Sequence, residues 1–301
     1  MYEQRFGFRR RPFPATPDAS CYYPSSIHEA ALTQLLQALT ANEGLALLTG
    51  PPGSGKTLLC HCLLERAPEG TASAFLTNTH CADRSALLQS ILFDLSLPYE
   101  EGTEQHLRLR LTDHLLKTAA EDRRTLLVVD EAHLLSSDLL EELRLLGNLE
   151  VGKQKAIQSV LIGQDDLSTT LARPELASLN QRIVARPVLQ PLGLEEAVDY
   201  LLHHLRAAGA KPESFIDETS LEILARGGRG VPRLLNQAGN QALTLAHAAE
   251  MNHVDSEAAF EALALLGLES SEGAETESHD TTELALVADD GPRAFDAPRR
   301  A

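Results

Sequence analysis

Short apolar runs alternate with longer amphipathic stretches along most of the chain. Five of the runs have the length and composition of buried β-strands, and they occupy residues 45–49, 74–77, 126–129, 159–162 and 183–189. The stretches between them place apolar side chains three and four residues apart, which is the spacing of one helical face. Strands that alternate with helices predict a parallel sheet covered on both faces. The pattern therefore predicts an α/β fold for residues 25–190.

One predicted helix, after the third strand, has a marked start and a continuous apolar face. Ser136 or Ser137 can cap it, because a serine oxygen accepts from the free N–H groups of a first turn, and Asp138 suits the positive end of the helix dipole. The apolar face consists of Leu139, Leu140, Leu143 and Leu146. Helical spacing this regular predicts a helix packed against the sheet.

The ends of the chain differ from this α/β region. After Pro191 no strand pattern follows, so residues 191–268 are predicted to form a small helical lid, with Pro232 in the first turn of one of its helices. Residues 1–24 carry four prolines and predict an extended arm, without a helix, lying on a folded body. Residues 269–301 hold more acidic than basic side chains and few aliphatic ones, which predicts a disordered acidic tail.

Composition narrows the class of protein further. Hydrophobic residues make up 43% and charged residues 23% of the 301, the balance of a globular protein. The formal charge of -17 repels phosphate backbones and gives no general support for nucleic-acid binding, although a local basic patch stays open. No apolar run is long enough to cross a membrane, so the cytoplasm is the expected location.

A phosphate-binding loop follows the first predicted strand. The run Gly50, Pro51, Pro52, Gly53, Ser54, Gly55, Lys56, Thr57 fits the pattern G-x-x-x-x-G-K-[ST] and, with Leu58, opens the next helix. Glycines let such a loop curl so that its N–H groups converge on phosphates at a helix N-terminus. Lys56 is expected to neutralise the β- and γ-phosphates of ATP, and the Thr57 hydroxyl to hold Mg²⁺.

Two carboxylates close the third predicted strand, as in a Walker B element. Asp130 is expected to hold the Mg²⁺ shell together with Thr57, and Glu131 to act as the general base toward the attacking water. Acidic strand ends are common in solvated turns, but a phosphate loop elsewhere in the same sheet calls for this partner. The sequence therefore predicts a Mg-ATP site.

Further motifs resemble one family, the AAA+ ATPases of the general secretion pathway protein A (ExeA) type, which include relatives in mannose-sensitive pilus biogenesis. The resemblance runs from Tyr2 to about Gly267 and depends on seven short segments beyond the phosphate loop. They are residues 6–8 with 12–13, 25–31 with His28, 130–133, 143–150, 161–164, 181–183 and 230–236. The resemblance implies an AAA+ core followed by a helical lid.

The resemblance also implies roles for four more residues. Gln164, after the fourth strand, resembles the sensor 1 position, and Asn78, after the second strand, resembles a residue that restrains the catalytic glutamate. Arg182 resembles an arginine finger offered to the ATP of a neighbouring subunit in a ring or dimer, and Arg233 resembles the sensor 2 arginine of the lid. Arginine suits such roles because it compensates charge on a transferring phosphoryl group. Arg173 and Arg186 remain alternatives for the finger.

Three functions follow as hypotheses. The first is an ATPase that drives or switches assembly of a secretion or pilus-like envelope system, with an envelope partner and recruitment to the inner face of the membrane as options. The second is a DNA-associated helper ATPase of the transposition or origin-recognition type, for which the acidic chain offers no basic surface. The third is a scaffold that binds ATP with little turnover, against which the presence of Glu131 argues. The membrane segment and cell-wall domain that the resemblance implies for the family are not expected here.

Overall fold

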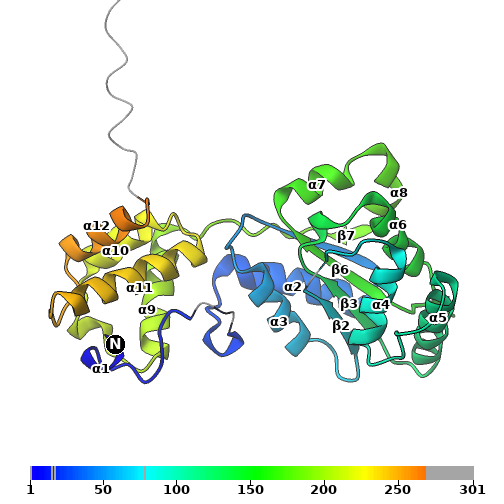
Figure 1. The fold of residues 1–301 in the computed structure, drawn as a ribbon, viewed down its shortest axis with the longest axis horizontal. Helices are drawn as coiled ribbons and strands as arrows, with labels where there is room; N and C mark the ends of the chain where they lie inside the picture. Colours follow the sequence, from blue (N-terminus) through cyan, green and yellow to red (C-terminus); the bar gives the residue numbers. More distant parts are fainter. Residues whose placement is uncertain (1, 15, 17, 78, 269–301) are drawn as a thin grey trace, which may run out of the picture. The chain divides into compact units, whose positions relative to one another are not determined.

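A five-stranded parallel sheet forms the centre of the larger part of the protein in the computed structural model, which describes residues 2–14, 16, 18–77 and 79–268. The strands are β1 (Leu45–Thr49), β2 (Ala72–Leu76), β3 (Thr125–Val129), β6 (Gln158–Gly163) and β7 (Ile183–Ala185). They lie in the order β2-β3-β6-β1-β7 (Figure 1). The predicted α/β class is therefore confirmed. The predicted acidic tail at residues 269–301 lies outside the described residues.

The last strand is shorter than the sequence predicts. The prediction of a continuous strand over residues 183–189 is wrong, because β7 ends at Ala185 and its register against β1 is irregular. Pro187 has no N–H for a ladder hydrogen bond, so the strand is interrupted there. Pairing with β1 resumes only as an isolated bridge between Thr49 and Val188.

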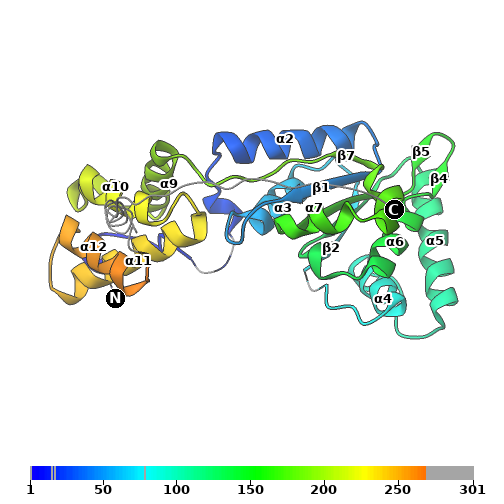
Figure 2. The same ribbon diagram turned by 90° about the horizontal axis from the view of Figure 1, so that it is seen from above.

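Helices cover both faces of the sheet, and alternate strand residues point to opposite faces. On one face, Ala46, Leu48 and their counterparts on β3 and β6 pack against α2 (Ser26–Thr40) and α3 (Lys56–Glu65). On the other face, Leu45 and Leu47 share a core with four helices, namely α4 (Arg84–Asp94), α5 (Glu104–Ala120), α6 (Ser137–Leu146) and α7 (Asp165–Leu171). The short α8 (Ala177–Asn180) and the hairpin of β4 (Glu150–Val151) and β5 (Gln154–Lys155) complete this region. Figure 2 shows α2 and α7 on opposite sides of β1.

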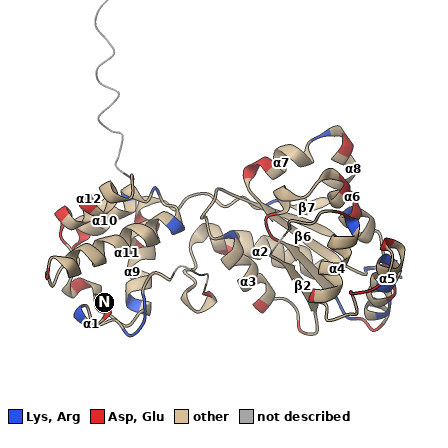
Figure 3. Cartoon of the chain, viewed as in Figure 1, with Lys and Arg blue, Asp and Glu red and all other residues tan. Residues whose placement is uncertain are grey.

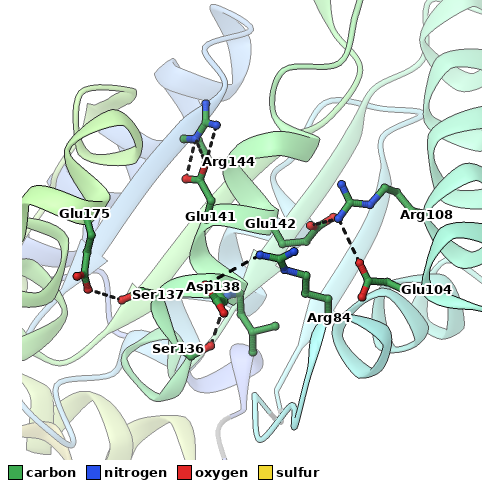
Figure 4. Close-up of polar contacts among 11 residues, drawn as sticks. Arg84, Glu104, Arg108, Ser136, Ser137, Asp138, Glu141, Glu142, Arg144 and Glu175 are labelled. Carbon is green, nitrogen blue, oxygen red and sulfur yellow. Dashed lines mark hydrogen bonds and ion pairs between the residues drawn. The ribbon is translucent and has the colours of Figure 1, made fainter.

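Helix α6 is held by its cap and by ion pairs to its neighbours. The Ser136 hydroxyl accepts from Leu139 N–H, so of the two predicted capping serines Ser136 is the cap. Figure 4 shows Glu142 on α6 meeting Arg108 of α5, while Arg84 of α4 lies 4.0 Å from the Asp138 carboxylate. Because the Glu142 side chain is completely buried, Arg108 compensates a charge that water cannot reach.

The helical lid consists of four helices around a second core. They are α9 (Leu194–Ala207), α10 (Glu218–Gly227), α11 (Pro232–Ala248) and α12 (Ser256–Leu265), and they appear together in Figures 1 and 2. Pro232 is the first residue of α11, where its missing N–H costs no helical bond. No helix of the described residues is both long and apolar enough to span a membrane.

The N-terminal arm is part of the lid rather than a purely extended segment. The prediction of an arm without helix is wrong at α1 (Tyr2–Arg5), and a 3-10 turn follows at Ala19–Cys21. Four aromatic side chains of the arm are buried in the lid core, namely Tyr2, Phe6, Phe8 and Phe13. Phe13 lies so close to Gly239 on α11 that a Cβ there would meet its ring at 2.6 Å. The arm therefore supplies apolar area that the small lid needs.

His204 on α9 is a buried histidine at the contact between the arm and the lid. It is buried, its Nδ1 lies 3.2 Å from the Pro12 carbonyl, and burial lowers the pKa of His204 to about 4. Between an unfolded value of 6.5 and about 4, the unfolded chain binds a proton that the folded chain does not. Stability should therefore fall as the pH falls through this window, by about 3 kcal/mol in total for this group.

Denaturant unfolding between pH 7 and pH 4 measures this effect. We expect His204→Asn, which keeps a donor for Pro12, to flatten the decline of unfolding free energy with falling pH. The same change at the exposed His106 is the matched control. Equal slopes for the wild-type protein and His204→Asn would contradict the assignment.

Candidate nucleotide site

The phosphate loop predicted from the sequence joins β1 to α3 at the carboxyl edge of the sheet. Gly53 and Gly55 have φ of +82° and +91°, values that favour glycine. A Cβ on Gly53 would also come within 2.7 Å of the Arg233 Cβ on α11. Gly55 immediately precedes α3, so the first N–H groups of that helix are at the loop. This geometry suits the close approach of an anion.

Lys56 is buried inside the curl of the loop. Its Nζ donates to the carbonyl groups of Gly50, at 2.8 Å, and Pro51, at 2.9 Å. Burial lowers the pKa of Lys56, while the nearby carboxylates of Glu131 and Asp130 act in the opposite direction. The ammonium group thus lies within reach of two acidic groups and of the loop that a phosphate would enter.

Asp130 and Thr57 meet although they are 73 positions apart in the chain. Asp130 follows β3, is 4% exposed, and accepts the Thr57 hydroxyl at 2.7 Å through Oδ2. Its Oδ1 accepts the Glu131 N–H at 2.9 Å. A hydroxyl and a carboxylate side by side form the hard oxygen pair that Mg²⁺ prefers, so these residues fit the predicted metal.

Gln164 follows β6, which lies between β1 and β3 in the sheet. It therefore lies between the phosphate loop after β1 and the acidic pair after β3. Its amide Nε2 is 3.3 Å from His133 Nε2, and His133 Nδ1 is in turn 3.3 Å from a Glu131 carboxylate oxygen. Glu131 itself has a left-handed backbone with φ of +51°. The Thr79 hydroxyl donates to its carbonyl at 3.0 Å, which helps to hold this uncommon conformation.

These groups face a cavity of about 520 Å³. The predicted residues that line it are Pro52, Gly53, Gly55, Lys56, Thr57, Leu58, Glu131, Gln164 and Arg233. The Arg233 N–H donates to the Gly53 carbonyl at 3.2 Å, so the first turn of α11 contacts the phosphate loop directly. Asp130 reaches the cavity through Thr57. Asn78, predicted to restrain the glutamate, lies outside the described residues.

Several cavity residues could not be predicted from motifs. The arm contributes Arg11, Phe13, Pro14 and Thr16, and the lid contributes Tyr200, Asn236, Gln237 and Asn240. Two lid amides are oriented by tyrosines, since Tyr200 donates to the Asn236 oxygen and Tyr2 to the Asn240 oxygen. Their amide nitrogens therefore remain as donors. Phe13 and Asn236 belong to segments that carry the family resemblance, and residues 233, 236, 237 and 240 share one face of a helix, but neither signal gave these residues a role at the site.

His28 contacts the phosphate loop, and this contact was not predicted from the sequence either. It is buried, its Nε2 lies 2.8 Å from the Ser54 carbonyl, and its Nδ1 lies 2.6 Å from the Ser25 hydroxyl. A carbonyl can only accept, so Nε2 carries a proton and Nδ1 accepts from Ser25. Burial lowers the pKa of His28, which favours this neutral form. His28 thus supports the phosphate loop from behind.

The three candidate finger arginines lie apart from the cavity. Arg182 follows α8 and donates to the Asn148 side chain, and Arg186 donates to the Asn180 carbonyl at 2.6 Å. Arg173 precedes a 3-10 turn and is exposed, as are the other two. None of them lines the cavity.

The phosphate loop on β1, the acidic pair after β3, the intervening β6 and the helical lid together define the AAA+ class of P-loop proteins. A family model described as "AAA domain" matches residues 39–171. General secretion pathway protein A of Aeromonas hydrophila is 39% identical over 249 residues, which are 82% of this chain and 45% of that protein. The chain belongs to the AAA+ family of the general secretion pathway protein A type, and it spans about half the length of that relative.

Solved structures with the same fold include ORC2, Cdc6p and RuvB proteins. The ORC2 protein of Aeropyrum pernix, solved as ADPNP-ADP complexes, has a TM-score of 0.66 at 17% identity and covers 86% of this chain and 72% of its own. Cdc6p of Pyrobaculum aerophilum has a TM-score of 0.64 at 22% identity, and the match covers 81% of this chain and 70% of that protein's chain. The RuvB branch migration motor of Thermotoga maritima has a TM-score of 0.55 at 17% identity, and the match covers 85% of this chain and 74% of that protein's chain. At such identities the likeness is one of fold.

Proposed function

We propose that this chain binds Mg-ATP in the cavity and hydrolyses it. The observation that carries the proposal is the convergence of Lys56, the Thr57–Asp130 pair and Glu131 at one edge of the sheet. Lys56 and Arg233 would neutralise the phosphates, and Thr57 with Asp130 would hold Mg²⁺, which lowers the charge repulsion during phosphoryl transfer. Glu131 would take the proton of the water that attacks the γ-phosphorus as ADP leaves.

The biological role that we propose is to drive or switch assembly of a secretion or pilus-like envelope system. Support comes from the relative named for the general secretion pathway, which is 39% identical over most of this chain. We propose action at the cytoplasmic face of the inner membrane, with an envelope protein as partner. Proteins that co-purify with a Glu131→Gln variant test this role, because a variant that binds without hydrolysis retains its client longest. Recovery of no envelope protein would contradict it.

A DNA-associated helper function is the second candidate, and the fold likeness to origin-recognition proteins favours it. The formal charge of -17 argues against it. Figure 3 shows basic positions next to acidic ones on α5, where Lys117 pairs with Asp113. Salt-dependent affinity for duplex DNA would support this function, and absence of binding at low salt would discard it.

Arg182 is proposed to act on the nucleotide of a neighbouring subunit. If so, Arg182→Ala should lower turnover by about 100-fold, since one charge-stabilising donor is lost. A mixture of Arg182→Ala with Glu131→Gln should recover activity, because an Arg182→Ala subunit keeps its base and receives an intact finger from the other. Steady-state phosphate release measures the recovery.

Arg173→Ala and Arg186→Ala are the matched controls, and they should retain most of the turnover. If one of these variants shows the large loss and the recovery instead, that arginine is the finger. A mixture no more active than the average of its two components would contradict action between subunits.

A further inference from the structure

His133 contacts two residues that line the cavity, Glu131 and Gln164. It is the middle residue of a 3-10 turn, Ala132–Leu134, that follows Glu131 without a break. Its side chain is 11% exposed and lines no part of the cavity, whereas Glu131 and Gln164 both do. The turn is packed tightly against the end of β6, where a Cβ on Gly163 would meet His133 N at 3.4 Å.

The two ring nitrogens of His133 face groups of opposite hydrogen-bonding character. Nδ1 is 3.3 Å from the Glu131 carboxylate, which can only accept, and Nε2 is 3.3 Å from the Gln164 amide nitrogen, which can only donate. Nδ1 is buried and makes no hydrogen bond in this structure, so its 3.3 Å approach to Glu131 is a close contact rather than a formed hydrogen bond. A neutral ring with its proton on Nδ1 has the character that both neighbours require, a donor toward the carboxylate and an acceptor toward the amide. The ring therefore connects the carboxylate to the amide.

Glu131 has little freedom left except in the direction of its carboxylate. Its N–H donates to Asp130, and its carbonyl accepts from the Thr79 hydroxyl and from Leu134 N–H. These bonds fix the left-handed backbone, but 43% of the side chain is exposed. A carboxylate that must take a proton from one water needs a defined direction, and His133 is the group placed to give it one.

We propose that His133 is a positioning residue that orients the Glu131 carboxylate and makes this orientation depend on Gln164. This inference rests on the proposed hydrolysis of ATP. Gln164 lines the cavity, so its amide can turn from His133 to a ligand there. The ring then loses its partner at Nε2 and is freer to move with the carboxylate. Occupancy of the cavity thereby alters the restraint on the base through two short contacts.

Two substitutions separate positioning from mere packing. His133→Leu removes both contacts, whereas His133→Gln keeps an amide donor for Glu131 and a carbonyl acceptor for Gln164. We expect His133→Leu to lower kcat by about tenfold to thirtyfold with KM unchanged, a part of the total contribution of a general base. His133→Gln should stay within about threefold of the wild-type protein. Replacing the exposed His106 by leucine is the matched control.

A double-mutant cycle tests the dependence on Gln164. If the contacts act as one chain, Gln164→Leu should cost less in the His133→Leu background than in the wild-type protein. Additive losses in kcat would overturn the dependence on Gln164. An unchanged kcat in His133→Leu, or equal losses in the leucine and glutamine variants, would overturn the positioning role.

The imidazole tautomer gives a readout that does not require turnover. In ¹⁵N spectra of the full chain labelled at histidine, the signals lost in His133→Gln should be those of a ring protonated at Nδ1. A ring protonated at Nε2 would overturn the inference even if the protein hydrolyses ATP. Failure of the proposed function has a different signature, because the wild-type protein and Glu131→Gln would then show the same turnover.

Discussion

Glu131→Gln is expected to lower ATP turnover by about 1,000-fold, the middle of the range for loss of a general base. Glutamine has nearly the same shape but cannot take a proton, so the phosphate loop, Lys56 and the Thr57–Asp130 pair should still bind nucleotide. Steady-state phosphate release measures the loss, and nucleotide titration measures the retained affinity.

The exposed Glu121 offers a matched control, since Glu121→Gln makes the same chemical change away from the cavity. Its turnover should equal that of the wild-type protein. Full activity of Glu131→Gln would contradict the assignment of the base, while loss of nucleotide binding would mean that the carboxylate has a structural role instead.

Arg108→Leu is expected to destabilise the fold by about 3 to 5 kcal/mol, because it leaves the buried Glu142 carboxylate without its counter-charge. Burial already raises the pKa of Glu142, although Arg108 opposes that effect. A carboxyl whose folded pKa lies above its unfolded value stabilises the protein as the pH falls. The difference in unfolding free energy between the wild-type protein and Arg108→Leu should therefore become smaller when unfolding is measured at lower pH.

The double variant Arg108→Leu/Glu142→Leu should recover most of the loss, since an apolar pair replaces a buried ion pair at little cost. Arg84→Leu is the control on the same surface. Its partner Asp138 is 85% exposed at 4.0 Å, so the change should cost under about 1 kcal/mol. A loss in Arg108→Leu no larger than in Arg84→Leu would show that the ion pair contributes little to stability.

The parts of the fold that could be predicted from the sequence are those decided locally. Buried strands and amphipathic helices leave a periodic record, so the order of elements in the sheet region was predictable, and Ser136 as a cap needs only its own turn. The continuous strand over residues 183–189 was wrong because Pro187 interrupts its pairing. The aromatic residues of the arm follow no single period, so their burial in the lid was not predictable in detail.

The residues of the site also divide into those that a local motif predicts and those that only the folded chain brings together. Short motifs whose spacing indicates a phosphate and metal site contain Lys56, Thr57, Asp130 and Glu131, and the structure brings these four residues together. The contacts of His28, His133 and the lid amides depend on segments that meet only in the folded chain. For example, the tyrosine that orients Asn240 is 238 positions away. No local pattern marks such a pair.

Calorimetric titration with Mg-ATP, performed on the wild-type protein and on Lys56→Ala, shows directly whether the cavity binds nucleotide. Lys56 bridges the loop carbonyls and lies near both carboxylates, so its loss should abolish most of the affinity while the fold persists. We expect saturable, magnesium-dependent binding of one nucleotide per chain to the wild-type protein and severely weakened binding to the variant. The absence of nucleotide binding by the folded wild-type protein, or equal affinity in both proteins, would show that the cavity around Lys56 is not a nucleotide site.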